Sequence, residues 1–160
     1  MIGQRPLEGL VDARLQLHWA AQVLARFGDA RVEARADYSH SALTWDPGRA
    51  CLRGELDPSG RRLELHPVDL VLRMSGPGGA SAEFGLQGRS LGGAFSWLAS
   101  LPGEEGRLEL GEPDVPFHPV STGAAFDPDI RDVAELAAWF HEEHTALERV
   151  RKVHLSASPV

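Results

Sequence analysis

The sequence is poor in cysteine, because Cys51 is the only one among its 160 residues. No disulfide can therefore form within the chain, which excludes the disulfide-rich scaffolds of small secreted proteins. The N-terminus has no apolar run of signal-peptide length, and no stretch approaches the roughly 18–20 apolar residues of a membrane-spanning helix. We therefore expect a cytoplasmic protein with no membrane partner.

Positive charge is also scarce. The 16 basic residues are outnumbered by 23 acidic residues, the formal net charge is −7, and Lys152 is the only lysine. Proteins that bind nucleic acids hold the phosphate backbone with clustered lysine and arginine side chains. The densest basic segment, residues 149–152, falls at the expected end of a helix, where cations favour the helix dipole. The sequence therefore predicts no nucleic-acid partner.

Length and composition are those of one globular domain. Chains of this size bury about 70% of their unfolded surface. Hydrophobic residues make up 42% of the sequence and charged residues 24%, which are ordinary values for a folded domain. We expect residues 1–160 to form a single domain.

Apolar residues recur at helical spacing in three segments. The expected helices are Leu7–Phe27, Leu91–Leu101 and Ile130 to about Val153. Gly28 follows the first as a C-terminal cap, Ser90 precedes the second as an N-terminal cap, and Asp129 or Asp127 caps the third. The third helix carries a face expected to lie on the sheet: Val133, Leu136, Ala137, Phe140, His144, Leu147 and Arg151.

Between the first two helices the pattern changes to short alternating segments. Turn sequences such as Asp46-Pro47-Gly48 and Gly76–Gly79 separate them. The expected strands are Arg31–Ala36, Ser41–Asp46, Arg49–Leu56, Arg62–Leu65, Val68–Ser75 and Ser81–Leu86, with a further strand possible at Arg107–Leu110 before a long ordered loop or linker over residues 111–129. The sequence predicts an α+β fold with an N-terminal helix, an antiparallel β-meander and covering helices, including a long C-terminal helix.

The segment from Asp37 to Gly48 is the strongest candidate for chemistry, because it gathers a carboxylate, hydroxyls, an imidazole and an indole near a turn. In the functional interpretation, His40 is an acid, a base or a ligand, Asp37 orients its ring, and Trp45 lines a pocket. In the structural interpretation, Asp37, Ser39 and His40 stabilise a turn through hydrogen bonds from their side chains to the backbone. Whether the protein is an enzyme stays open.

Other histidines extend the candidate set. His118 lies between two prolines that stiffen its loop, so it is either a pocket wall or a solvent-facing residue. His141 and His144 lie three residues apart on the last helix and offer a metal-ligand face. Their spacing differs from that of H-E-x-x-H, which excludes a zinc-protease motif, and His144 falls in an apolar stripe typical of a core histidine. The metal hypothesis names His40, His141 and His144 as ligands of a divalent cation.

Several short motifs together resemble a bacterial protein family of unknown function. They are His18-Trp19-Ala20-Ala21-Gln22, Asp37-Tyr38-Ser39-His40, Leu43-x-Trp45-Asp46, Gly88-Arg89-Ser90-Leu91, Phe117-His118-Pro119-Val120, Ala124-Ala125-Phe126-Asp127 and Ser156-Ala157-Ser158-Pro159-Val160. No activity comes with the resemblance. In such proteins the chain continues into a stretch with cysteine, tryptophan, proline, paired histidines, phenylalanine and aspartate. The resemblance therefore implies that this chain is an N-terminal portion that lacks a C-terminal segment.

The expected function is a pocket between sheet and helices, centred on His40, that binds a small molecule or a metal ion. Trp45, His118 and either His141 or His144 would line it. The alternative is a non-catalytic interaction or accessory subunit, in which a strand edge or the last helix docks a partner chain. His66, at the end of a predicted strand, is expected to be structural.

Overall fold

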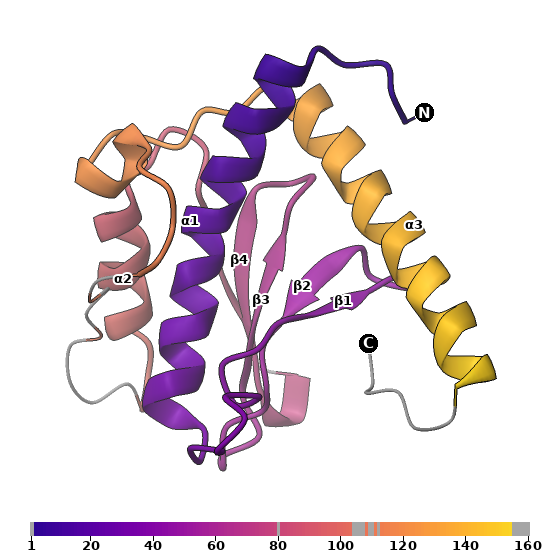
Figure 1. The fold of residues 1–160 in the computed structure, drawn as a ribbon. Coiled ribbons are helices and arrows are strands. Elements are labelled where there is room, and N and C mark those ends of the chain that lie inside the picture. The colour runs from indigo at the N-terminus through magenta and orange to yellow at the C-terminus, as the bar shows by residue number, and fades with distance from the viewer. Residues whose placement is uncertain (1, 80, 104–107, 109–110, 112, 155–160) are drawn as a thin grey trace.

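The fold was obtained as a computed structural model that describes residues 2–79, 81–103, 108, 111 and 113–154 (Figure 1). The elements are α1 (Leu7–Arg31), β1 (Thr44–Asp46), β2 (Cys51–Arg53), β3 (Arg62–His66), β4 (Val71–Ser75), η1 (Pro77–Gly79), β5 (Ser81–Gly85), α2 (Leu91–Ala99), η2 (Pro119–Thr122) and α3 (Ile130–Val153). The predicted α+β fold, with its N-terminal helix, antiparallel meander and long C-terminal helix, is confirmed. No helix in the described part of the chain is long and apolar enough to cross a membrane.

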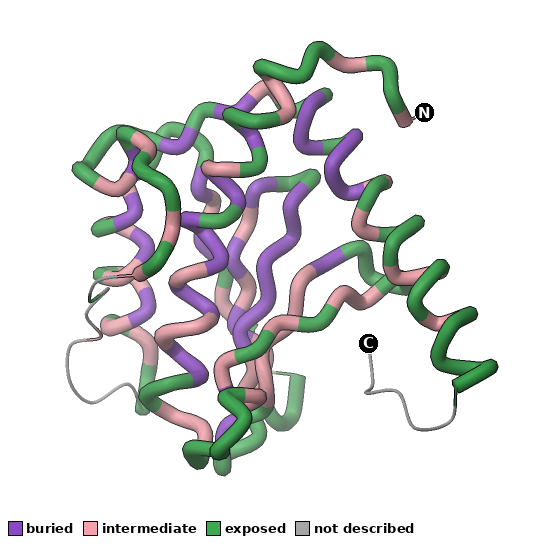
Figure 2. The backbone as a smooth tube through the Cα atoms, viewed as in Figure 1, coloured by how far each residue is buried: buried purple, intermediate pink, exposed green. Residues whose placement is uncertain are grey.

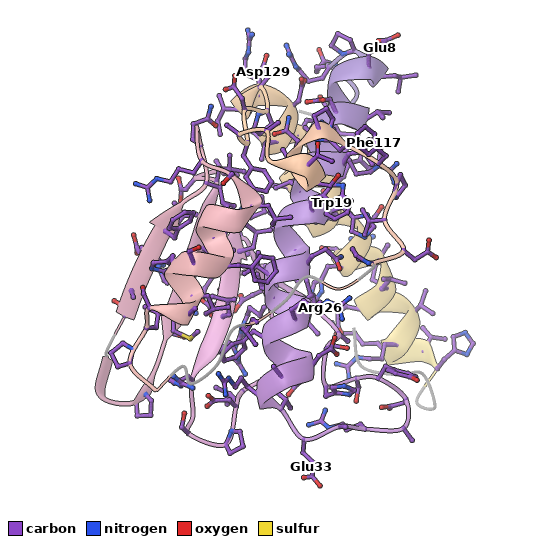
Figure 3. The ribbon with its side chains drawn as sticks, turned by 90° about the vertical axis from the view of Figure 1, so that its left-hand side faces the viewer. Glu8, Trp19, Arg26, Glu33, Phe117 and Asp129 are labelled. Carbon is purple, nitrogen blue, oxygen red and sulfur yellow. The ribbon has the colours of Figure 1, made fainter. Side chains whose placement is uncertain are left out.

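The five strands form one antiparallel sheet in the order β1-β2-β3-β4-β5. Register places one row of side chains across it, in which Trp45 pairs with Leu52, Leu52 with Leu65, Leu65 with Leu72 and Leu72 with Phe84. Paired residues of antiparallel strands lie on the same face, so this row belongs to one face of the sheet. The helices lie on that side of the strands, as the turned view in Figure 3 shows, and this face is therefore the core face.

The first helix is the centre of the core. It packs on β3, α2 and α3, and its side chains Leu24 and Phe27 are almost fully buried. At the middle of the helix, the Trp19 indole N–H donates a hydrogen bond of 3.1 Å to the carbonyl oxygen of Pro116. This bond ties α1 to the segment that carries Phe117, which is labelled beside Trp19 in Figure 3.

The end of α1 differs from the prediction. Gly28 lies inside the helix, which continues to Arg31, and the N–H of Val32 donates to the Gly28 carbonyl at 2.9 Å. Glycine is needed there for a different reason, because a Cβ on residue 28 would lie 2.5 Å from the backbone oxygen of His40. The predicted strand at 31–36 is therefore wrong, since these residues end the helix and enter a loop that returns to it.

The other predicted boundaries are closer. The Ser90 hydroxyl accepts the Gly93 N–H at 3.2 Å, and the Asp129 carboxylate accepts the Arg131 N–H at 2.9 Å, so both expected N-terminal caps are confirmed. The strands expected at 41–46 and 49–56 shorten to β1 and β2, because turns occupy their ends. The strand expected at 107–110 lies outside the described residues except for position 108.

Only the first part of α3 is enclosed. Its fully buried residues are Asp132, Val133, Glu135, Leu136 and Ala137, all near its N-terminus. Phe140 then packs on Trp45, with ring centroids 5.5 Å apart. Beyond it the expected apolar face no longer meets the sheet, since Leu147 is 51% exposed. Figure 2 shows this change from buried to exposed along α3.

Acidic side chains of α3 and its cap hold the N-terminal segment. Glu135 accepts hydrogen bonds from the backbone N–H groups of Gly3, Gln4 and Arg5. Arg5 also pairs with Asp129 at 2.8 Å and contacts Asp132. Burial alone raises the pKa of Glu135, but the three backbone N–H donors, together with the Trp139 side chain, outweigh it and lower this pKa below its usual value.

We predict that this attachment is sensitive to acid and to loss of the Glu135 charge. A carboxylate with a depressed pKa contributes stability that is complete above its ordinary range, near pH 4.5 for Glu135, and is lost as the pH falls below it. Glu135→Gln should therefore make the amides of residues 3–5 exchange with solvent on the order of tenfold faster at neutral pH. Unchanged exchange by NMR, relative to the exposed control Glu33→Gln, would contradict this role.

Candidate metal site

The face of the sheet opposite the helices carries a polar group. Side chains alternate along a strand, so Glu64 and His66 of β3 point away from the core face that Leu63 and Leu65 occupy. Arg53 pairs with Glu64, and Cys51, two residues before Arg53, lies on the same outer face. Two neighbouring strands thus place a thiol, a carboxylate and an imidazole next to one another.

These three side chains are close together and shielded from solvent. One ligand atom of each of Cys51, Glu64 and His66 lies within 4.8 Å of the other two. Cys51 and Glu64 are 0% exposed and His66 is 8% exposed. Within the described residues, this is the one group of three or more such side chains with metal-ligand spacing.

A tight turn between β1 and β2 completes the surroundings of Glu64. Asp46 accepts the N–H groups of Gly48 and Arg49 at 3.0 and 3.1 Å, which fixes the turn that carries Arg49. The Arg49 guanidinium then donates to Oε1 of Glu64 at 2.5 Å, and Arg53 Nε lies 3.7 Å from the same oxygen. Asp46 also accepts from Arg53 at 2.7 Å. Both arginines therefore face one oxygen of Glu64.

The second oxygen of Glu64 has no hydrogen-bond donor. Glu64 Oε2 and His66 Nε2 lie 3.5 Å apart, yet both are buried atoms without a hydrogen-bond partner. Buried polar atoms are almost always satisfied in folded proteins, because leaving one unpaired costs about 1–3 kcal/mol. An atom that bonds to both groups at once would remove this deficit.

Cys51 is protonated in this environment at neutral pH. Burial and, to a lesser extent, the nearby Glu64 charge raise the pKa of its thiol from 9.0 to about 11. A buried thiol of this kind is a poor nucleophile. It becomes a strong ligand only if a cation displaces its proton, as coordinated thiols do.

Sulfur, nitrogen and oxygen donors together suit a borderline-soft divalent cation such as zinc. Tetrahedral zinc places its ligand atoms about 3.3–3.8 Å apart, given bonds of roughly 2.0–2.3 Å. The separations here have an upper limit of 4.8 Å, so rotamer adjustments of about 1 Å would bring the donors into range. Three protein ligands would leave the fourth position for water or another ligand.

His40 occupies a different place, at the C-terminal end of α1. Its Nδ1 accepts the Arg35 N–H at 3.1 Å, and its Nε2 lies 3.4 Å from Asp29. Asp29, rather than Asp37, is the acid beside the ring. Asp37 instead accepts the Ser39 N–H at 3.1 Å, and this hydrogen bond lowers the pKa of Asp37. These contacts hold the returning loop against the helix, as the structural interpretation of this segment expects.

His118 lies far from His40. Its Nε2 is 3.1 Å from Asp12, whereas His40 lies beside Asp29, and these acids are seventeen residues apart on α1. A rise of 1.5 Å per residue separates them by about 25 Å. His118 Nδ1 also accepts the Val120 N–H at 3.3 Å, which caps η2. The structure therefore does not bring His40 and His118 into one pocket.

The remaining candidates lie along α3 and β1. Trp45 packs on Phe140, and its indole nitrogen is buried without a hydrogen-bond partner. His141 is exposed, whereas His144 is half-buried with its Nδ1 unpaired. His141 and His144 do not share a metal-ligand group with His40 among the described residues.

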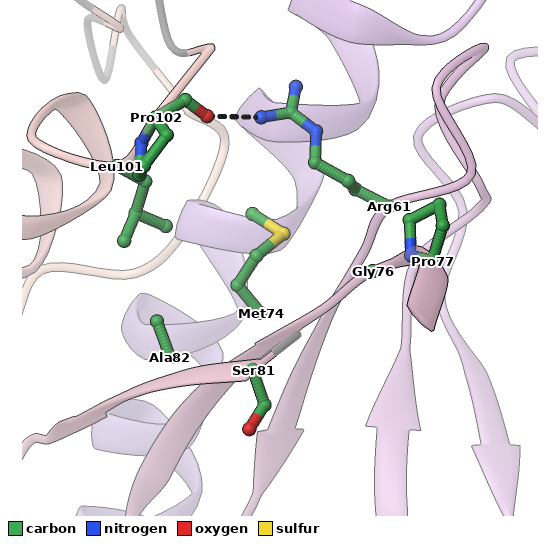
Figure 4. Close-up of a pocket in the computed structure, with 8 residues that line it drawn as sticks. All are labelled: Arg61, Met74, Gly76, Pro77, Ser81, Ala82, Leu101 and Pro102. Carbon is green, nitrogen blue, oxygen red and sulfur yellow. Dashed lines mark hydrogen bonds between the residues drawn. The ribbon is translucent and has the colours of Figure 1, made fainter. Parts of the chain in front are cut away.

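A cavity of about 310 Å³ lies elsewhere, where β4 ends and β5 begins (Figure 4). Met74, Ala82 and Leu101 give it a mostly apolar lining. Arg61 stands at its edge and donates to the Pro102 carbonyl at 3.0 Å, as the dashed line in Figure 4 marks. None of the histidines expected from the sequence lines this cavity.

Comparisons with protein-family models, curated proteins and solved structures found no match to this chain. The resemblance to a bacterial family of unknown function therefore stays a prediction, and the candidate site is argued from its geometry.

Proposed function

We propose that the protein is a cytoplasmic metal-binding protein that holds one zinc-like divalent cation between Cys51, Glu64 and His66. The observation that carries the proposal is the pair of buried atoms without hydrogen-bond partners, Glu64 Oε2 and His66 Nε2, beside the Cys51 thiol. A cation at this point would bond to all three donors. The proposal keeps the divalent metal expected from the sequence but replaces the ligands His40, His141 and His144.

Arg49 lies between the proposed cation site and solvent, so it affects how strongly the cation binds. The side chain of Arg49 is 43% exposed while that of Glu64 is 1% exposed, so the guanidinium forms the boundary between the carboxylate and solvent. An exposed arginine can move away without breaking the core, and its charge opposes a cation at Glu64. We infer that Arg49 weakens binding at this site and makes it reversible.

A competitive titration tests the proposal. The purified chain, first stripped with a chelator, is titrated with zinc in the presence of a chromophoric chelator. We expect one equivalent to be taken from the chelator, with a higher unfolding temperature in excess zinc, because a ligand that binds only the folded state stabilises it. A chain that takes no zinc, or takes several weakly held equivalents without a change in unfolding temperature, would overturn the proposal.

A further inference from the structure

The C-terminal part of α3 exposes an apolar stripe that we call the α3 stripe: Trp139, Ala146, Leu147, Val150 and Val153. The large side chains of this stripe are 41%, 51%, 53% and 76% exposed in chain order. Their successive spacings of eight, three and three residues, with Ala146 seven residues after Trp139, place them along one side of the helix. A face of this kind needs an apolar partner to be covered.

Beyond Phe140, which packs on Trp45, the same part of α3 has little support from the rest of the fold. Its fully buried residues end at Ala137, although the helix continues to Val153. Isolated helices of about 12–15 residues are marginal in water, since most helical stability in proteins comes from packing an apolar face. Residues 141–153 would therefore gain stability from a second helix along the α3 stripe.

The charged residues beside the α3 stripe favour a second copy of α3 in the antiparallel direction. Acidic residues Glu142 and Glu143 precede Ala146, and Arg149 follows it, whereas Arg151 is paired with Glu148 of the same helix. If a second copy of α3 lies antiparallel along the stripe with Ala146 at the centre, Glu142 of each copy meets Arg149 of the other. A parallel copy would instead place like charges together, which is unfavourable.

The apolar positions agree with the same register. An antiparallel pair centred on Ala146 places Trp139 of one copy beside Val153 of the other. The small Ala146 side chain lies at the crossing point, where the helices approach most closely. Glu143 falls within the arc of the stripe, and Arg151 pairs with Glu148 of its own helix at 3.0 Å, so the charged flank of this register is the side that carries Glu142 and Arg149.

We propose that the protein forms a homodimer through the α3 stripe, with the two α3 helices antiparallel and centred on Ala146. The contact spans about four turns of each helix, so its area falls at the small end of the range for specific interfaces. The dimer should therefore dissociate in the micromolar range. Higher salt should weaken it, because the flanking pairs are exposed.

Charge reversal provides the test, by sedimentation equilibrium over a range of concentrations. The wild-type chain should reach the mass of a dimer, with and without a chelator. Glu142→Arg and Arg149→Glu should each weaken self-association about tenfold, because each change creates two like-charge contacts per dimer. An equimolar mixture of the two variants should associate like the wild type, as should the double variant Glu142→Arg with Arg149→Glu.

Several outcomes would overturn the proposal. A wild-type chain that stays monomeric at the highest concentration would show that a second copy does not cover the stripe. Single reversals that associate normally, or a mixture that does not recover, would exclude the antiparallel register. All the changed residues are exposed, and an unchanged circular dichroism spectrum would exclude misfolding as the cause of a loss.

Discussion

The Cys51→Ser variant is expected to bind zinc at least about 100-fold more weakly than the wild-type chain. Loss of groups that merely orient metal ligands typically costs 10–100-fold in affinity, and loss of a ligand itself should cost no less. A serine hydroxyl at this buried position keeps a similar volume but does not form the thiolate that zinc favours. Competition with a chromophoric chelator measures the change.

Matched variants separate this site from the histidines of α3. His66→Gln should weaken zinc binding to a similar extent, whereas His141→Gln should leave it unchanged, because His141 is exposed and lies on another element. Arg49→Gln should bind zinc about tenfold more tightly, since it removes a cation from Oε1 of Glu64. Loss of binding in His141→Gln with retention in Cys51→Ser would reject the proposed ligands.

Gly28→Ala is expected to reduce the free energy of unfolding by about 1–3 kcal/mol. The added Cβ would lie 2.5 Å from the backbone oxygen of His40 and 3.0 Å from Cα of Ser41. Both are backbone atoms, so the whole loop that His40 anchors must move away from α1. A fall of about 2–4 °C in melting temperature is expected for each kcal/mol in a chain of this size.

Gly92→Ala is the matched control, because Gly92 also lies in a helix. A Cβ there would find its nearest neighbour, the Ser90 hydroxyl oxygen, at 3.9 Å. Alanine is a better helix former than glycine by up to about 1 kcal/mol, so this variant should be neutral or slightly more stable. If Gly28→Ala is as stable as Gly92→Ala, the close approach of the His40 loop is not a constraint on the fold.

The order of elements was predictable because local signals agreed with the fold. Turn sequences such as Asp46-Pro47-Gly48 separate short strands, and the capping roles of Ser90 and Asp129 depend only on neighbouring residues. The end of α1 was not predictable, because Gly28 has the identity of a cap but serves a contact with residue 40. That contact is remote in sequence, so no local pattern reveals it.

The candidate site was harder to find for a similar reason. Cys51 and His66 lie on different strands and meet only through the register of β2 and β3. A signal was present in Glu64 and His66, two polar residues that alternate with Leu63 and Leu65 in a strand buried on both faces. The segment around His40 has more side chains capable of chemistry and was therefore the stronger candidate from sequence, yet its polar groups bond mainly to the neighbouring backbone.

Absorption spectroscopy of the cobalt-loaded chain tests the proposed metal site most directly. Cobalt(II) takes the same ligands as zinc, and a bound thiolate gives it a charge-transfer band in the near ultraviolet together with intense visible bands when the geometry is tetrahedral. We expect these bands to saturate at one cobalt per chain and to disappear on adding zinc. A cobalt-loaded chain without a thiolate band would contradict coordination by Cys51.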